Sequence, residues 1–167
     1  HAHTDTDARV VVVTGGGKDF CVGADSQDLK TIEESGGNYQ KAKLELPPYP
    51  EGTPETFQRT HAYPLSISTP IIAAVNGACA GVGFLVASYA DFRFGATNNK
   101  IKSSFARLGL PAEYGLGWLL PRMMGRANAL QILLDGDRID GQEALRLGWL
   151  QKLHEPEELL EKALEYA

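Results

Sequence analysis

The feature that most constrains the fold is the segment at residues 76–83, which reads NGACAGVG and lies between two apolar runs. The first run, Ile71–Val75, is typical of a buried strand, and the second begins at Phe84, directly after the last glycine. A strand that ends in glycines and restarts as a helix leaves backbone N–H groups at the helix start without intrahelical acceptors. Such groups converge on one point and bind negative charge. The segment therefore predicts a turn that holds an oxyanion.

Composition limits the class of protein. With 167 residues, of which 43% are hydrophobic and 22% charged, the chain has the make-up of one soluble domain with a real core. Its apolar runs are far shorter than the roughly 20 residues of a spanning helix, and the first residues lack a signal pattern, so we predict a cytoplasmic protein without membrane contact. The net charge is -5 and the basic residues are scattered, which predicts no nucleic-acid partner. Cys21 and Cys79 show no CxxC spacing, which favours two reduced thiols over a disulfide or a metal site.

Strand and helix patterns alternate along the chain. Apolar, β-branched runs predict strands at 9–14, 71–75, 92–96, 100–102 and 150–153. Caps and periodicity predict helices at 25–32, 54–66, from 82 onward, 115–124, 128–134, 141–147 and 157–167. This alternation is typical of an α/β domain with a largely parallel sheet. We expect a single domain over residues 1–167, with a mobile surface loop at 33–54 that is rich in Gly, Pro, Glu and Lys.

A second glycine-rich loop, GGGKDFCVGAD at residues 15–25, follows the first predicted strand. Neither loop contains the GxGxxG pattern of dinucleotide binding, and GGGKD lacks the GxxxxGK[ST] pattern of a P-loop. The chain also has no GxSxG nucleophile elbow, which disfavours a serine hydrolase. Two loops that both point N–H groups inward remain the main functional signal.

Four strings then carry a family resemblance, in this order: FCVGAD at 20–25, IIAAVNGACAGVGF at 71–84, YADFRF at 89–94 and PAEYGLGWLLPR at 111–122. The order and spacing resemble the crotonase superfamily of enoyl-CoA hydratases and isomerases, over residues 9–153. The resemblance implies a crotonase-like ββα spiral core, with largely parallel sheets flanked by helices. Against that family, an N-terminal strand-rich segment and C-terminal helices are missing, so we expect a fragment, or the ordered part, of a longer protein. It also implies assembly as a homotrimer or hexamer.

The resemblance implies a specific chemistry. Family members bind an acyl-CoA thioester, with its oxygen between two backbone N–H groups that hold enolate-like charge. By position these donors are Ala24 and Val82. A valine in place of the glycine that is common at the second position keeps its N–H group. One such donor contributes roughly 3 to 4 kcal/mol to transition-state stabilisation. Coenzyme A enters as part of the substrate, and no separate cofactor and no metal are implied.

The acid and base groups depart from the hydratase pattern. The two positions at which hydratases of the family place glutamates read Leu85 and Phe105. Neither side chain transfers protons, so two-glutamate hydration is poorly supported. Glu113 lies where dienoyl-CoA isomerases place a proton-shuttling aspartate and aryl-CoA dehalogenases a nucleophilic one. We expect apolar neighbours (Leu110, Tyr114, Leu116 and Trp118) to desolvate it and suit it to proton transfer.

Three readings of Glu113 remain open: a proton shuttle for double-bond isomerisation, a nucleophile, or a surface or structural residue in a loop. The alternative function is a non-catalytic acyl-CoA binding protein on a degenerate crotonase scaffold, which Leu85 and Phe105 favour. The expected substrate-binding residues are Val22, Asp25, Gln27, Tyr63, Gly81, Phe84, Phe105 and Trp118. Asp25 also fits a helix cap, and the aromatic residues also fit a core. Weaker candidates are His61 and Phe57 for the pocket wall, and Lys30 and Arg107 for the CoA phosphates.

Overall fold

The computed structural model describes residues 5, 7–23, 51–55 and 63–167. The predicted helix at 25–32, most of the predicted loop at 33–54 and most of the predicted helix at 54–66 lie outside these residues. Within the described part of the chain, no helix is long and apolar enough to cross a membrane.

Within the described residues, the larger sheet has four parallel strands. They are β1 (Val11–Thr14), β2 (Ile71–Val75), β4 (Phe92–Ala96) and β7 (Lys152–His154), and they lie in the order β1-β2-β4-β7. All three strand pairs are parallel. The bounds of β2 and β4 are those predicted, and every residue of β2 is buried. A strand covered on both faces reads as a continuous apolar run, which is why the sequence located it correctly.

A smaller sheet lies beside the first and contains β3 (Ala78–Ala80), β5 (Lys100–Lys102) and β6 (Ile139–Asp140). β3 and β5 are parallel, and β5 and β6 are antiparallel. β5 was predicted, but β3 and β6 were not, because runs of two or three residues are too short to show a period. β3 places a strand inside the segment that the sequence presented only as a turn.

The helices mostly follow the sequence pattern. In the described part of the chain, the α-helices are α2 (Val82–Tyr89), α3 (Leu116–Met124), α4 (Arg126–Leu130), α5 (Gly141–Arg146) and α6 (Leu159–Tyr166), with 3₁₀ turns at Tyr63–Ser66 and Ala106–Leu108. Asp140 caps α5 as predicted, because its carboxylate accepts a hydrogen bond from the Glu143 N–H at 2.8 Å. The predicted helix at 128–134 begins earlier, as α4, and continues as a π-helical turn over Gln131–Asp135.

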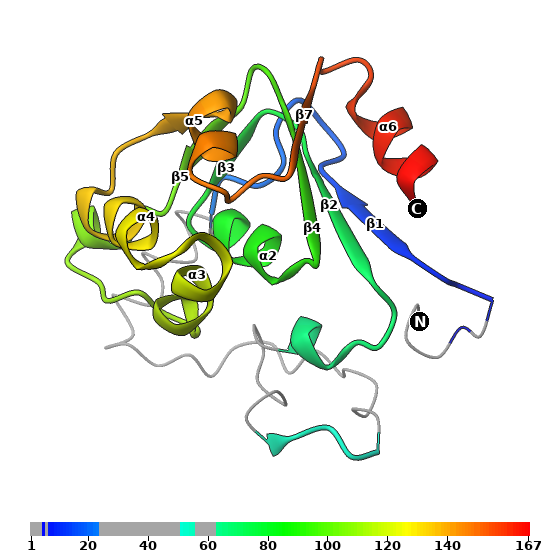
Figure 1. Ribbon diagram of the computed structural model, residues 1–167, viewed down its shortest axis with the longest axis horizontal. Helices are drawn as coiled ribbons and strands as arrows, with labels where there is room; N and C mark the ends of the chain where they lie inside the picture. Colours follow the sequence, from blue (N-terminus) through cyan, green and yellow to red (C-terminus); the bar gives the residue numbers. More distant parts are fainter. Residues whose placement is uncertain (1–4, 6, 24–50, 56–62) are drawn as a thin grey trace, which may run out of the picture.

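Helices cover both faces of the larger sheet (Figure 1). On one face, α6 packs against residues that alternate along the strands, with Leu159 and Ala163 contacting Ile72, Ala74 and Phe94. On the other face, α2 and α3 pack against the opposite set from β2: Ile71, Ala73 and Val75. The arrangement confirms the expected α/β fold with largely parallel sheets flanked by helices. It also places α2, which follows the NGACAGVG segment, in the centre of the molecule.

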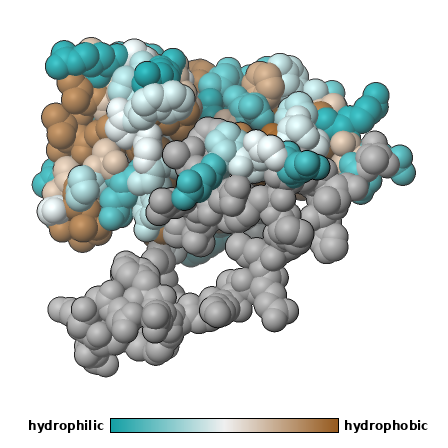
Figure 2. Space-filling view, turned by 90° about the horizontal axis from the view of Figure 1, so that it is seen from below, coloured by the Kyte–Doolittle hydropathy of each residue, from teal (hydrophilic) through white to brown (hydrophobic). Residues whose placement is uncertain are grey.

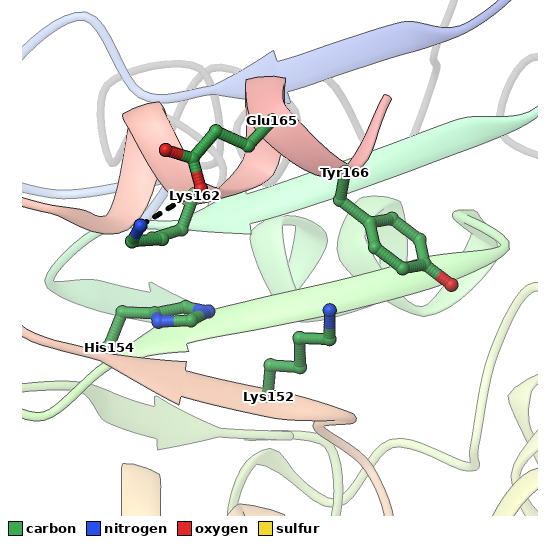
Figure 3. A pocket seen from close by; sticks show the side chains of 5 residues that line it. All are labelled: Lys152, His154, Lys162, Glu165 and Tyr166. Carbon is green, nitrogen blue, oxygen red and sulfur yellow. Dashed lines mark hydrogen bonds and ion pairs between the residues drawn. The ribbon is translucent and has the colours of Figure 1, made fainter.

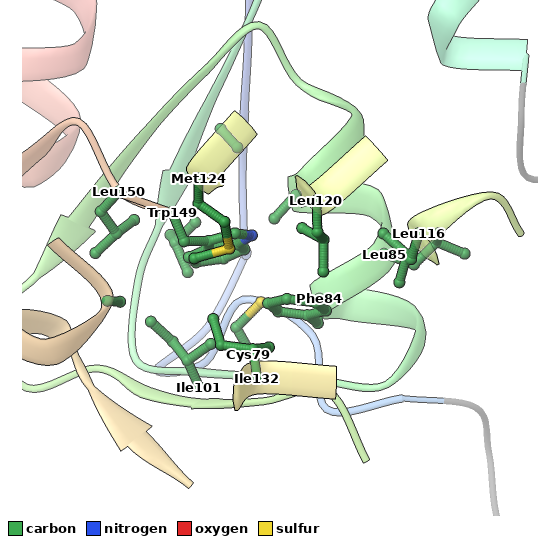
Figure 4. Close-up of a cluster of buried hydrophobic side chains, with 14 of the residues drawn as sticks. Cys79, Phe84, Leu85, Ile101, Leu116, Leu120, Met124, Ile132, Trp149 and Leu150 are labelled. Atoms are coloured by element: carbon green, nitrogen blue, oxygen red, sulfur yellow. The ribbon is translucent and has the colours of Figure 1, made fainter. Parts of the chain in front are cut away.

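The core around α2 contains a stacked aromatic pair (Figure 4). The rings of Phe84 and Trp149 lie 4.9 Å apart between centroids, at an interplanar angle of 17°. The indole Nε1 of Trp149 donates a hydrogen bond to the Ser88 hydroxyl at 2.9 Å, and that hydroxyl donates to the Phe84 carbonyl at 2.7 Å. Ser88 is therefore the acceptor that satisfies a fully buried tryptophan.

We expect Ser88→Ala to lower the free energy of unfolding by about 1–3 kcal/mol, because the buried Trp149 N–H loses its acceptor. The matched control is Thr97→Val, which removes an exposed hydroxyl that donates to Glu155 at 2.9 Å and should change stability by no more than about 0.5 kcal/mol. Denaturant titration followed by fluorescence measures both. Equal effects for the two variants would contradict the role of Ser88 as the acceptor for the Trp149 N–H group.

Candidate active site

The two glycine-rich loops lie side by side. The N–H groups of Phe20 and Cys21 donate to the Ala78 carbonyl at 3.0 and 3.2 Å, and the Ala80 N–H donates to the Cys21 carbonyl at 2.9 Å. These bonds place Cys21 in parallel register with Cys79 of β3. Segments far apart in the sequence are thus paired like strands of one sheet, a pairing that the sequence analysis did not predict.

Side-chain hydrogen bonds hold the loops in that position. The Asn76 side chain accepts from the Gly15 N–H at 2.8 Å and donates to the Gly17 carbonyl at 2.7 Å. The Asp19 carboxylate accepts from the Ala78 N–H at 2.9 Å. Sequence reasoning did not single out Asn76 or Asp19. A polar residue directly after a fully apolar strand was the available signal, because Asn and Asp side chains satisfy backbone groups in turns.

Asn99 completes this network from the turn between β4 and β5. Its side-chain amide is buried and donates to the carbonyls of Val75 and Gly77 at 2.9 and 2.7 Å. Its side-chain oxygen accepts from the Ala96 N–H at 2.8 Å. The end of β2 is therefore held from two sides, by Asn76 and by Asn99.

Two glycines are required for this close approach. A Cβ at Gly77, which has φ +70°, would lie 2.0 Å from the Lys18 carbonyl oxygen. A Cβ at Gly83 would lie 2.1 Å from the Cys21 carbonyl oxygen. Both contacts are far inside van der Waals distance, so a side chain at either position would separate the two loops. Gly83 explains why α2 begins directly against the backbone of the first loop.

Val82 is the first residue of α2 and is partly buried. The preceding Gly81 turns the chain with φ 53° and ψ -116°, and the Leu85 N–H makes a hydrogen bond to the Gly81 carbonyl at 3.0 Å. The N–H groups of residues 82–84 precede that bond and have no intrahelical acceptor. The positive end of the helix dipole adds to their affinity for negative charge. Val82 is thus the first residue of α2, and its role as an oxyanion donor stays a prediction.

The other predicted donor, Ala24, lies outside the described residues, as do Asp25, Gln27, Lys30, Phe57 and His61. The first loop is described up to Gly23, which lies against the second loop: a Cβ at Gly81 would be 3.7 Å from the Gly23 Cα. Val22 is 66% exposed at the same point. Gly81 and Val22 are thus close to Val82, and their substrate contacts remain predictions, as does that of Tyr63, which begins a 3₁₀ turn.

Glu113 lies in the turn at residues 111–115, just before α3, and is partly buried. Its main-chain carbonyl accepts from the Leu116 N–H at 3.1 Å. The next residue, Tyr114, has φ +51°, a left-handed conformation that costs a non-glycine residue energy. The Tyr89 hydroxyl donates a hydrogen bond to the Tyr114 carbonyl, and burial raises the pKa of Tyr89, which keeps this donor protonated.

Helix α2 therefore connects the two predicted catalytic elements. Val82 is its first residue, and Tyr89, its last, contacts the turn that contains Glu113. With eight residues the helix is about 12 Å long. Tyr89 begins the YADFRF string, but its contact with this turn was not predicted, since a tyrosine at the end of an apolar helix looks like any other core residue.

The surroundings of Glu113 are more open than the sequence suggested. Leu116 is buried, but Leu110, Tyr114 and Trp118 are 43%, 42% and 57% exposed. The Arg122 guanidinium lies 4.0 Å from the centre of the Trp118 ring. Among the described neighbours, Leu116 alone is enclosed. Figure 2 shows apolar surface on the side where α3 and α4 lie, and the exposed apolar residues there include Leu108, Leu130 and Leu134.

The structure shows the packing or pairing of four further residues that the sequence analysis named. Leu85 and Phe105, where the family resemblance places glutamates, are buried, as is Phe84. Phe84 stacks on Trp149, and Phe84 and Phe105 both belong to the core cluster, so contact of either with an acyl chain remains a prediction. Arg107 forms an ion pair with Asp137.

A cavity of about 230 Å³ opens elsewhere, between β7 and α6 (Figure 3). It is lined by Lys152, His154, Lys162, Glu165 and Tyr166. Lys162 pairs with Glu165 at 2.9 Å, and the Lys152 ammonium lies 4.0 Å from the centre of the Tyr166 ring. Because α6 and α2 pack on opposite faces of the larger sheet, this cavity is separate from the site at the two loops.

Comparison with known proteins identifies the family of the chain. The family model described as Enoyl-CoA hydratase/isomerase matches residues 1–167. The chain belongs to the enoyl-CoA hydratase/isomerase family, and the resemblance to the crotonase superfamily is confirmed.

Individual relatives show the range of the family. The chain is 35% identical over 162 residues to the crotonyl-CoA hydratase of Syntrophomonas wolfei, with 93% of this chain and 55% of the relative covered. It is 31% identical over 166 residues to the 1,2-epoxyphenylacetyl-CoA isomerase of Escherichia coli, with 98% and 59% covered. The crystal structure of an enoyl-CoA hydratase, EchA12_1, from Mycobacterium marinum superposes with a TM-score of 0.71 at 34% identity, covering 98% of this chain and 66% of that one. The chain spans about half the length of the curated relatives it matches.

Proposed function

We propose that this protein binds an acyl-CoA thioester, stabilises its enolate, and moves a proton along the acyl chain to isomerise a carbon–carbon double bond. The observation that supports the proposal is the start of α2, where the N–H of Val82, the first helical residue, has no acceptor within its own helix and lies beside the loop that leads to Ala24. Family membership supports the thioester as the substrate class. Coenzyme A is part of that substrate, and assembly as a homotrimer or hexamer belongs to the proposal.

The proposed reaction needs one carboxylate. Glu113 removes a proton from C2 of a 3-enoyl-CoA, and the charge moves onto the thioester oxygen, between the N–H groups of Ala24 and Val82. The protonated Glu113 then returns a proton to C4, which leaves the double bond between C2 and C3. Isomerisation is preferred to hydration because the positions of the hydratase glutamates hold Leu85 and Phe105, which are buried and apolar.

A second candidate function is binding of an acyl-CoA without turnover. It is favoured by the same two apolar residues and by the exposure of Leu110 and Trp118 near Glu113. A third reading, in which Glu113 attacks the substrate as a nucleophile, requires a covalent acyl-enzyme that mass spectrometry detects.

A substrate panel separates these functions. We expect conversion of 3-enoyl-CoA to the 2-enoyl isomer to be faster than hydration of 2-enoyl-CoA, as measured by chromatography of the products. The free thioester incubated without protein is the control. Tight binding of every thioester with no product would support the binding protein, and faster hydration than isomerisation would contradict the preference proposed here.

A further inference from the structure

The two cysteines of the chain are register partners across the paired loops. Cys21 bonds through its N–H to the Ala78 carbonyl and through its carbonyl to the Ala80 N–H, so it lies directly opposite Cys79. Both are free thiols. Because the two cysteines are far apart in the sequence, the sequence analysis did not predict that they are partners.

The strand-like pairing gives a Cα spacing that a disulfide can span. Neighbouring strands lie about 4.7–4.9 Å apart, inside the Cα separation of about 4.4–6.8 Å that disulfides span. Residues in register present their side chains on the same face of a strand pair, and here both reach the start of α2. A Cβ at Gly83 would lie 2.7 Å from the Cys21 Cβ, and the Cys79 side chain packs in the core beside Phe84 (Figure 4).

The two thiols differ in access. Cys79 is fully buried, whereas Cys21 is partly buried. Burial raises the pKa of Cys79, and charge on the adjacent Cys21 raises it further. An oxidant therefore meets Cys21 first, and Cys79 is in place to react with the product.

We propose that Cys21 and Cys79 are a redox-active pair that forms an intramolecular disulfide in the presence of hydrogen peroxide. The Cys21 thiolate attacks the peroxide, which breaks the O–O bond and gives a sulfenic acid and, after protonation, water. The Cys79 sulfur then attacks the sulfenic sulfur; its proton leaves with the departing hydroxide as a second water, and the S–S bond forms. The two thiols are oxidised and the peroxide is reduced.

The proposed disulfide lies close to the candidate active site. Cys21 lies three residues before Ala24, and Cys79 lies three residues before Val82. A covalent link at this point joins the two loops immediately ahead of both proposed oxyanion donors. The inference itself rests on the register of the loops and is independent of the proposed function.

The test is peroxide treatment of the purified protein, followed by thiol capping, trypsin digestion and mass spectrometry without reductant. The expected product is peptide 19–30 linked to peptide 60–93 in a monomer, with both titratable thiols lost and restored by dithiothreitol. Cys79→Ser should give no link and should leave a Cys21 sulfenic acid that dimedone traps. The proposal is overturned if both thiols survive, if Cys21 proceeds to sulfinic acid without a link, or if the link appears only between two molecules. The wild-type result decides the question even where the variant fails to fold.

Discussion

Val82→Pro should lower the turnover number for a 3-enoyl-CoA roughly 10²–10³-fold while the protein remains folded, because it deletes one N–H group and little else. Val82 is the first residue of α2, the position at which proline is favoured in helices, since its missing N–H has no intrahelical partner. Proline also restricts the residue before it, but here that residue is glycine, which tolerates unusual backbone angles. The Val82→Pro variant therefore removes the N–H donor while the helix is expected to form.

The matched control is Val82→Ala, which trims the same side chain but keeps the N–H group. We expect its turnover to stay within a few-fold of wild type, with circular dichroism and melting temperature showing that both variants fold. Because the donor acts on charge that develops in the transition state, the proline effect should fall on kcat more than on KM. Unchanged turnover in a folded proline variant would show that the oxyanion is held elsewhere.

The larger sheet was predictable because a strand that is buried on both faces has a continuous apolar run in its sequence. β2 is apolar at every position, and β4 is largely apolar. The bounds predicted for both strands are those that the structure shows. The start of α5 was also predictable, because Asp140 and the Glu143 N–H interact within a single turn. These features depend on residues that are close together in the sequence.

What the sequence could not predict depends on contacts between distant segments. β3 has three residues, and it is a strand only because β5 lies beside it and Cys21 bonds to its edge. The pairing of Cys21 with Cys79 follows from the register of two loops, which no local pattern encodes. The hydrogen bond from Tyr89 to Tyr114 is of the same kind.

The candidate site shows the same division. The glycines predicted the turn before α2, since a strand–turn–helix unit is local, and the family resemblance then pointed to Val82 within it. It did not separate residues that face a ligand from residues that face the core, because both are apolar with the same period. Phe84 illustrates the difficulty: only the position of Trp149, from a distant segment, shows that its ring stacks in the core.

Glu113→Gln should lower kcat for isomerisation roughly 10²–10⁴-fold and leave the dissociation constant of a CoA thioester nearly unchanged, since a neutral amide of the same shape cannot carry the proton. The turn itself should persist, because the Leu116 N–H bonds to the main-chain carbonyl of residue 113 and not to its side chain. Glu157→Gln is the control: this carboxylate is exposed and lies just ahead of α6, which packs on the opposite face of the sheet from α2.

The same pair of variants tests the proton path directly. In heavy water, a wild-type enzyme that shuttles one proton on Glu113 should place part of the substrate's own C2 proton at C4, because the protonated carboxyl exchanges in competition with return to the substrate. Glu157→Gln should behave as wild type, and Glu113→Gln should lose both turnover and exchange at C2. If Glu113→Gln stops isomerisation but C2 exchange continues at the wild-type rate, another base removes that proton and Glu113 acts only in its return to C4. If both reactions continue, the turn before α3 is structural, and the proposed oxyanion site at Val82 works with a base other than Glu113.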